Sequence, residues 1–169
     1  IMTHTSGLTY GFMQTNVVDA AYRKEGLEGL GDIQNLEAWV KRAAAIPLVC
    51  QPGSQWNYSI STDVLGRLVE VWSDLSLEQF FHERIFAPLK MVDTGFHVRE
   101  ENRPRFSALY SPLSGASMSS VATSGDPFAD KKTGIKLQES SEKSRYFKPP
   151  AIFSGGGGLV STLADYGRF

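Results

Sequence analysis

The stretch "QPGSQWNYSISTDVLG", residues 51–66, runs from a turn into a helix. Pro52 and Gly53 make the turn, and an aromatic pair and several hydroxyl residues separate it from a helical pattern that begins near Asp63. Tyr58 lies about one turn ahead of that helix, where unpaired N–H groups and the helix dipole give a partial positive charge. Such a field favours a phenolate, so Tyr58 is either a catalytic general base or a structural tyrosine in the core.

Two further helices are predicted on either side of this stretch. Residues 36–45 carry apolar side chains at helical spacing, with Asn35 as the N-cap and Pro47 as the stop. The tetrapeptide "SLEQ" at 76–79 is a capping box, in which the serine and the glutamine each bond the other's backbone N–H. The helix that it opens should end before Pro88, because proline interrupts helical hydrogen bonding.

The helix at the end of the quoted stretch is predicted over residues 63–73. Apolar residues recur there at the helical period and end in Trp72, and Ser61 or Thr62 can cap the first turn. A stripe of this kind packs against a core. We therefore expect Trp72, and also Trp56 in the loop, to be core residues rather than walls of a substrate site.

Residues 99–150 differ from the rest of the chain. They are rich in serine, glycine, lysine, glutamate and proline, and their apolar residues are scattered, which predicts an exposed polar excursion with short strands. The glycines at 155–158 follow, and because they lack the lysine of a phosphate-binding loop, we expect them to serve tight packing. Thr162 and Asp165 then form a capping box for the last helix.

Two short matches in the polar excursion spell motifs of penicillin-binding enzymes. Lys132-Thr133-Gly134 matches the lysine-threonine-glycine triplet, and Ser140 with Lys143 matches the nucleophile motif. They come in the wrong order, and the surrounding residues offer no apolar face that could hold a nucleophile helix against a core. We therefore interpret both as solvated surface.

The composition excludes several classes of partner. The chain has 169 residues, of which 41% are hydrophobic and 21% charged, as in ordinary globular domains, and its net charge of −1 gives no reason to expect nucleic acid. It has no apolar run long enough to span a bilayer. The histidines His4, His82 and His97 lack the spacing of metal ligands, and no motif indicates a cofactor, so we expect neither.

Four segments, in this order, resemble the serine β-lactamase-related family. They are "THTSGL" (3–8), "PGSQWNYS" (52–59), "APLKMVDTGF" (87–96) and "GGGGLVSTLADYGRF" (155–169). The family includes class C β-lactamases, DD-peptidases and the carboxylesterases of family VIII. The resemblance implies an α+β fold of the β-lactamase/transpeptidase type, with residues 1–169 as an internal part of one catalytic domain that covers mainly its helical portion.

The resemblance also implies a role for Tyr58. The family's central motif, in its Tyr-Ser-x form, falls on Tyr58-Ser59-Ile60, so the family's catalytic tyrosine corresponds to Tyr58. The nucleophile serine with its lysine would precede "THTSGL", and the third motif would follow Phe169, so both are expected outside this chain. Ile60 stands where lactamases usually carry an asparagine that binds the acylamino group of the substrate, which favours the esterase branch.

The function implied by this resemblance is a cofactor-free serine hydrolase that cleaves short-chain carboxylic esters through an acyl-enzyme. Its partner would be a small ester or a β-lactam-like substrate, and residues 1–169 alone would be inactive. A β-lactamase, a D-aminopeptidase or an acyltransferase of the same family stays open as an alternative, and so does a non-catalytic scaffold relative. The oligomeric state stays open, and the cytoplasm is favoured slightly over the periplasm.

Overall fold

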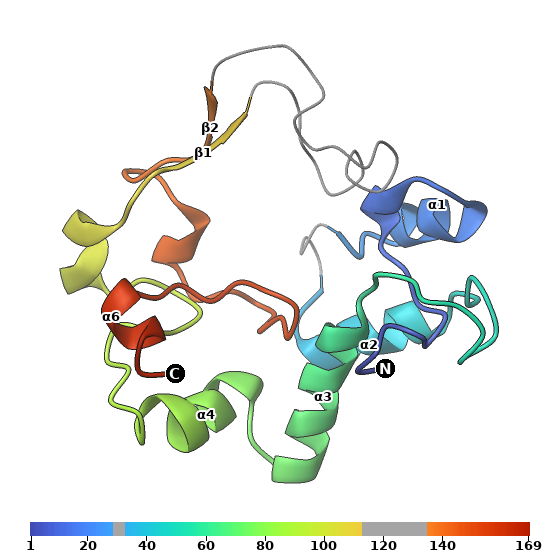
Figure 1. The fold of residues 1–169 in the computed structure, drawn as a ribbon, viewed down its shortest axis with the longest axis horizontal. Helices are drawn as coiled ribbons and strands as arrows, with labels where there is room; N and C mark the ends of the chain where they lie inside the picture. Colours follow the sequence, from blue (N-terminus) through green and yellow to red (C-terminus); the bar gives the residue numbers. More distant parts are fainter. Residues whose placement is uncertain (29–32, 113–134) are drawn as a thin grey trace.

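The computed structural model describes residues 1–28, 33–112 and 135–169, which form a mostly helical structure with a short antiparallel hairpin (Figure 1). The α-helices are α1 (Val17–Lys24), α2 (Leu36–Ala44), α3 (Ser61–Ser73), α4 (Leu77–Phe81) and α6 (Leu163–Tyr166). The strands are β1 (Leu109–Pro112) and β2 (Ile135–Glu139). The short helical turns are η1 (Gly11–Met13), η2 (His82–Phe86), η3 (Glu100–Arg105) and η4 (Arg145–Phe147).

The helix α2 begins and ends where its flanking residues predict. Asn35 Oδ1 accepts a hydrogen bond from the backbone N–H of Ala38 at 2.8 Å, and Pro47 follows the last turn. Three residues on one face are buried in the core: Leu36, Trp39 and Ala43. The predicted helix and its cap are therefore confirmed.

The capping box that opens α4 is also present. Ser76 Oγ accepts a hydrogen bond from the backbone N–H of Gln79 at 3.2 Å, and Gln79 Oε1 accepts one from the backbone N–H of Ser76 at 3.1 Å. The helix then widens into the π-helical turn η2, which ends at Phe86, before Pro88. The start and the end are confirmed, whereas the π-helical second half was not predicted.

The helix α3 starts earlier than the sequence predicts, and only part of its apolar stripe packs against the core, at Val64 and Val69. It begins at Ser61 and no side chain caps it, so the predicted caps are wrong. Its buried residues are Ser61, Asp63 and Gly66. Gly66 is buried because another segment packs closely on it: a Cβ there would lie 3.3 Å from the Cα of Gly155. Trp72 is 77% exposed and Trp56 is 68% exposed, so the expectation that both are core residues is also wrong.

The four segments that carry the family resemblance meet in two pairs. In the first pair, "THTSGL" runs beside "PGSQWNYS". The backbone N–H of Gly53 donates to the carbonyl of Thr5 at 2.7 Å, and that of Asn57 donates to the carbonyl of His4 at 2.8 Å. The loop that carries Tyr58 is therefore fastened along its length to the start of the chain.

The second pair joins "APLKMVDTGF" to "GGGGLVSTLADYGRF". Gly95 and Val160 exchange two backbone hydrogen bonds, of 3.1 and 2.8 Å. From this bridge the chain continues into α6, while the preceding glycine-rich segment reaches across to the first turn of α3 (Figure 1). The glycine-rich segment therefore links the two pairs of motifs.

Asp165, at the start of α6, strengthens this second pair. Its carboxylate, 1% exposed, accepts hydrogen bonds from the backbone N–H of Asp93 at 2.6 Å and from the hydroxyl of Thr94 at 3.0 Å. Thr162 Oγ1 accepts from the backbone N–H of Asp165 at 3.2 Å, which confirms Thr162 as a cap. Only this half of the predicted capping box forms, because the Asp165 carboxylate accepts hydrogen bonds from Asp93 and Thr94 instead of from the backbone of Thr162.

The polar excursion contains the hairpin of β1 and β2, which lies at the opposite end of the structure from α4 (Figure 1). All five residues of β2 except Glu139 are exposed, so the prediction of short strands at the surface is confirmed. Ser140 Oγ accepts from the backbone N–H of Lys143 at 3.3 Å, and Lys143 is exposed. This match is a surface turn, as interpreted from the sequence, and residues 132–134 lie outside the described residues.

Candidate active site

Tyr58 lies half-buried between two other rings, two residues before Ile60 and the start of α3. Its ring centroid is 5.1 Å from that of His4 and 5.2 Å from that of Tyr10. The backbone is fixed on both sides, because Asn57 donates to the His4 carbonyl at 2.8 Å and Ile60 donates to the Thr9 carbonyl at 3.3 Å. The phenol hydroxyl makes no hydrogen bond to any residue in the described part of the chain. It is therefore held in place and still free to bind a further group.

Tyr10 is the second phenol of this cluster, and its environment keeps it neutral. Burial raises its pKa well above the ordinary value of about 10, and the nearby Asp63 carboxylate and Tyr58 raise it further. Its other face stacks on Phe12, with the ring centroids 4.7 Å apart. A phenol that holds its proton this firmly cannot act as a base at neutral pH, so Tyr10 is not a candidate for the proton-transfer group.

A chain of hydroxyl groups runs beneath Tyr58. His4 Nδ1 lies 3.3 Å from Ser59 Oγ, Ser59 Oγ lies 2.8 Å from Ser61 Oγ, and Ser61 Oγ lies 2.9 Å from Ser6 Oγ. Ser59 and Ser61 are completely buried. Ser6, which the sequence analysis does not place at the site, is the last member of this row of hydroxyl groups, and its partner is Ser61. The contacts of His4 with Tyr58 and Ser59 were not predicted.

Asp63, in the first turn of α3, fastens the glycine-rich segment to the site. Its Oδ1 accepts hydrogen bonds from the hydroxyl of Ser154 and, at 3.2 Å, from the backbone N–H of Gly156. A Cβ on Gly155 would lie 2.2 Å from the carbonyl oxygen of Thr62. The prediction that these glycines serve tight packing is confirmed for Gly155, whereas nothing lies within 4 Å of a Cβ placed on Gly157.

A pocket of about 430 Å³ opens beside Tyr10. Five aromatic residues contribute to its walls: Tyr10, Phe12, Trp39, Phe96 and Tyr146. The backbone of Gly156–Gly158 forms another part of the wall, and Arg145 and Lys148 lie among the lining residues. Since the Tyr10 ring touches both this pocket and Tyr58, an apolar group bound here would lie close to the phenol.

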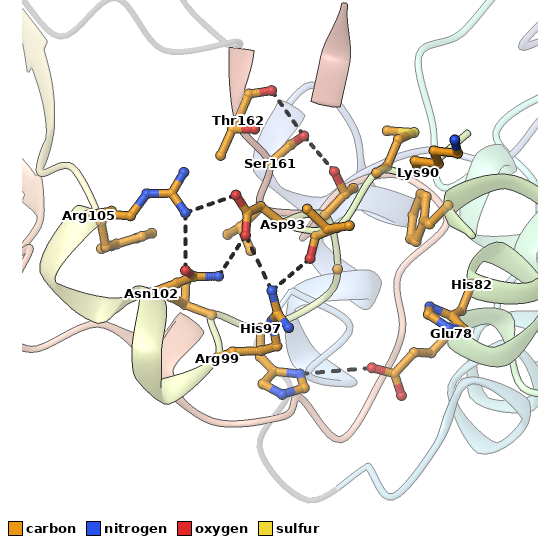
Figure 2. Close-up of a pocket in the computed structure, with 18 of the residues that line it drawn as sticks. Glu78, His82, Lys90, Asp93, His97, Arg99, Asn102, Arg105, Ser161 and Thr162 are labelled. Atoms are coloured by element: carbon orange, nitrogen blue, oxygen red, sulfur yellow. Dashed lines mark hydrogen bonds and ion pairs between the residues drawn. The ribbon is translucent and has the colours of Figure 1, made fainter. Parts of the chain in front are cut away.

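A larger pocket of about 630 Å³ lies away from Tyr58, between the α4–η2 region, η3 and residues 91–98. Figure 2 shows that the charged side chains there bind one another: Asp93 accepts from Asn102 at 2.8 Å, from Arg105 at 2.9 Å and from Arg99 at 3.3 Å. The hydrogen bond from Arg105 is the largest cause of an Asp93 pKa below its ordinary value. Because these groups satisfy one another, we interpret the cluster as structural.

Lowering the pH should remove the stability that the Asp93 carboxylate contributes. An ordinary aspartate has a pKa of about 3.9, and the folded-state value here is lower. The contribution is therefore complete above about pH 4 and is lost as the pH falls through the folded-state pKa. In melts of the full-length protein from about pH 6 to pH 2, the gap in Tm between wild type and Asp93→Asn should close below about pH 4. A gap that stays constant would contradict this role.

Ile60 does not take the place that the sequence analysis gives it. Its side chain is 1% exposed and belongs to the hydrophobic core with Tyr22, Leu77 and Phe96. A side chain enclosed by its own domain cannot contact a substrate, so the argument that Ile60 selects esters over acylamino substrates is wrong. Asparagine at this position would bury an amide rather than offer it to a ligand.

The described residues give no sign of a metal centre or a membrane span. Among residues 1–28, 33–112 and 135–169, no group of three or more histidine, cysteine, aspartate or glutamate side chains could hold a metal ion. Within the same ranges, every helix is too short or too polar to cross a bilayer.

Comparison with known proteins gives a consistent family. A protein-family model described as Beta-lactamase matches residues 1–169. The chain is similar to Protein Rv1367c of Mycobacterium tuberculosis, with 33% identity over 100% of this chain and 36% of that protein. It is also similar to Esterase EstB of Burkholderia gladioli, with 30% identity over 98% of this chain and 41% of that protein. The chain thus spans well under half the length of these relatives.

The fold of the chain is also similar to that of a solved structure. The solved structure of EstCE1, described as a hydrolase with promiscuous acyltransferase activity, superposes with a TM-score of 0.73 at 22% identity, covering 98% of this chain and 42% of that one. This likeness confirms the β-lactamase/transpeptidase-like fold expected from the sequence. Other relatives, which match over a shorter part of this chain, are named acyltransferases.

Proposed function

We propose that this chain, which belongs to the beta-lactamase family, is an internal part of a longer catalytic domain that hydrolyses short-chain carboxylic esters through an acyl-enzyme. The relationship to hydrolases and acyltransferases supports the general class of reaction. The similarity to Esterase EstB, over 98% of this chain, supports an ester as the substrate. Because the chain spans 36–41% of its relatives, the serine and its lysine are assigned to parts of the protein outside residues 1–169.

In this proposal Tyr58 moves the proton. The serine hydroxyl attacks the ester carbonyl while Tyr58, together with the lysine, accepts the serine proton. The tetrahedral intermediate collapses when the same proton passes to the leaving alkoxide, and water then releases the acyl group by the reverse sequence. Backbone N–H groups would hold the oxyanion. The aromatic pocket beside Tyr10 is a candidate for the acyl chain.

One observation carries this assignment. Tyr58 is a phenol at the start of α3 whose hydroxyl has no partner among the described residues, while the neighbouring phenol of Tyr10 is kept protonated. A proton-transfer group needs an accessible hydroxyl on a rigid support. Tyr58 is only half-buried and its backbone is hydrogen-bonded on both sides, so it meets both requirements.

The substrate class can be tested directly with the full-length protein. We expect it to hydrolyse p-nitrophenyl acetate or butyrate readily and nitrocefin weakly, and to show a burst of p-nitrophenol as the acyl-enzyme accumulates. If kcat/KM for nitrocefin equals or exceeds that for the ester, a lactamase takes the place of the esterase. Ester formation with an added alcohol that outpaces hydrolysis would indicate an acyltransferase, and no turnover of either substrate would indicate a scaffold.

A further inference from the structure

We infer that His4 is a positioning residue for Tyr58, holding the phenol in the orientation from which it moves the proton. The inference rests on the proposed function, because it assigns His4 a role through Tyr58. In the proposed mechanism His4 does not contact the substrate. Three independent features of the structure lead to it: the backbone conformation of His4, the packing of its ring, and the hydroxyl chain that begins at its Nδ1.

The backbone of His4 adopts a conformation that a non-glycine residue rarely takes. Its φ is +54°, in the left-handed region, which is strained for a residue with a Cβ and persists only where the surroundings hold it. Two backbone hydrogen bonds do so: His4 N–H donates to Ile1 at 3.0 Å, and the His4 carbonyl accepts from Asn57 at 2.8 Å. The second of these comes from the residue next to Tyr58.

Three other described non-glycine residues have this conformation: Gln14 and Asp74 directly follow a helix, where a left-handed residue is the usual terminator, and Lys90 ends the hydrogen-bonded turn that follows η2. His4 follows no helix within the described chain. Its conformation instead directs the ring toward the Tyr58 loop. Strain that no helix end explains is a reason to look for a function of that residue.

The ring of His4 packs against both aromatic residues of that loop. Its centroid lies 5.1 Å from the Tyr58 ring at an interplanar angle of 45°, and 6.1 Å from the Trp56 ring at 65°. Offset and edge-on contacts at these distances are favourable. Tyr10 is the second ring in contact with Tyr58, at 5.2 Å, so removal of the His4 ring would leave the phenol with one of its two ring contacts.

The Nδ1 of His4 completes the arrangement. It lies 3.3 Å from the hydroxyl of Ser59, and the series of hydrogen bonds continues from Ser59 through Ser61 to Ser6. Ser59 follows Tyr58 in the chain, and Ser61 begins α3. The histidine therefore contacts the tyrosine ring, the next residue of its backbone and, through one hydroxyl, the helix behind it. Each contact limits the rotation of Tyr58 rather than binding a ligand.

The test uses two variants of the full-length protein, assayed with p-nitrophenyl butyrate. His4→Asn is the main variant, because asparagine tolerates a left-handed backbone but has no ring, and His4→Ala is the second. We expect kcat to fall between about 10- and 100-fold in both, with KM within about twofold of wild type, because a misplaced proton-transfer group acts in the transition state. His82→Ala, which removes an exposed histidine, is the matched control and should leave kcat unchanged.

A double-mutant cycle separates positioning from a general structural role. In a Tyr58→Phe background, His4→Asn should lower kcat little further, because the hydroxyl that it positions is already absent. An equal loss in both backgrounds would overturn the inference, and so would a His4→Asn kcat within twofold of wild type. If Tyr58→Phe itself keeps full activity, the proposed function fails instead, so the two failures can be told apart. If His4→Ala does not fold, His4→Asn alone decides.

Discussion

Replacing Tyr58 by phenylalanine should lower kcat for p-nitrophenyl butyrate by roughly 10²–10⁴ and leave the fold intact, which is the usual range for a proton-transfer group. The change removes only the hydroxyl, and this hydroxyl makes no hydrogen bond within the described part of the chain. The ring contacts with His4 and Tyr10 stay in place. Steady-state kinetics and a thermal melt of the full-length protein would measure the two effects separately.

Tyr10→Phe provides the matched control, because it removes a phenol hydroxyl from the same cluster. Burial and the Asp63 carboxylate keep the Tyr10 pKa high, so this phenol stays protonated. Removal of its hydroxyl should therefore change kcat little. We expect its kcat to stay within about threefold of wild type, because a phenol that stays protonated does not accept the serine proton. A Tyr58→Phe enzyme that also stays within that range would return Tyr58 to a structural role. A large loss of kcat in Tyr10→Phe, with none in Tyr58→Phe, would identify Tyr10 as the base instead.

The parts of the fold that the sequence predicts correctly are those coded by residues close together in the chain. Asn35 bonds the N–H of Ala38, and Ser76 bonds that of Gln79, so each cap is complete within four residues. Such signals need no knowledge of what packs against the helix. The exposed turn at Ser140 is predictable for the same reason.

The errors concern packing across long separations in the sequence. The stripe that ends in Trp72 is predicted to face the core, but only its Val64 and Val69 pack there and Trp72 is exposed. The fully buried contact of α3 is instead at Gly66, on which Gly155 packs. An amphipathic pattern indicates that one face is apolar and not which segment covers it. The family resemblance places Ile60 where lactamases carry a substrate-binding asparagine, and only the structure shows that it belongs to the core.

The candidate site also contains residues that local sequence signals indicate and residues that only long-range packing brings in. Tyr58 can be proposed from the sequence, because its position ahead of a helix and its place in a recognisable motif are both local features, and its catalytic role stays a prediction. His4 cannot, because its contact with Ser59 joins residues 55 apart in the sequence. Nor does any local pattern predict its left-handed backbone, which depends on hydrogen bonds to Ile1 and Asn57. In the sequence, His4 stands out only as a possible metal ligand, and it lacks the spacing of one.

Gly155→Ala tests whether the glycine-rich segment sets the position of α3. The added Cβ would lie 2.2 Å from the carbonyl oxygen of Thr62 and 3.2 Å from the backbone nitrogen of Gly66. Both are backbone atoms of α3, which cannot rotate away as a side chain can. Overpacking of this kind costs about 3 kcal/mol at the upper end of its usual range, so the urea midpoint of the full-length protein should fall accordingly.

The same substitution should reduce activity, because the start of α3 that must move is three residues from Tyr58 in sequence. Gly157→Ala is the matched control: nothing lies within 4 Å of its Cβ, and its φ is not in the left-handed region, so stability should stay within about 0.5 kcal/mol of wild type. Comparing two glycines of one run removes any general effect of stiffening the loop. If Gly155→Ala proves as stable and as active as Gly157→Ala, the close contact between this segment and α3 does not hold Tyr58 in place.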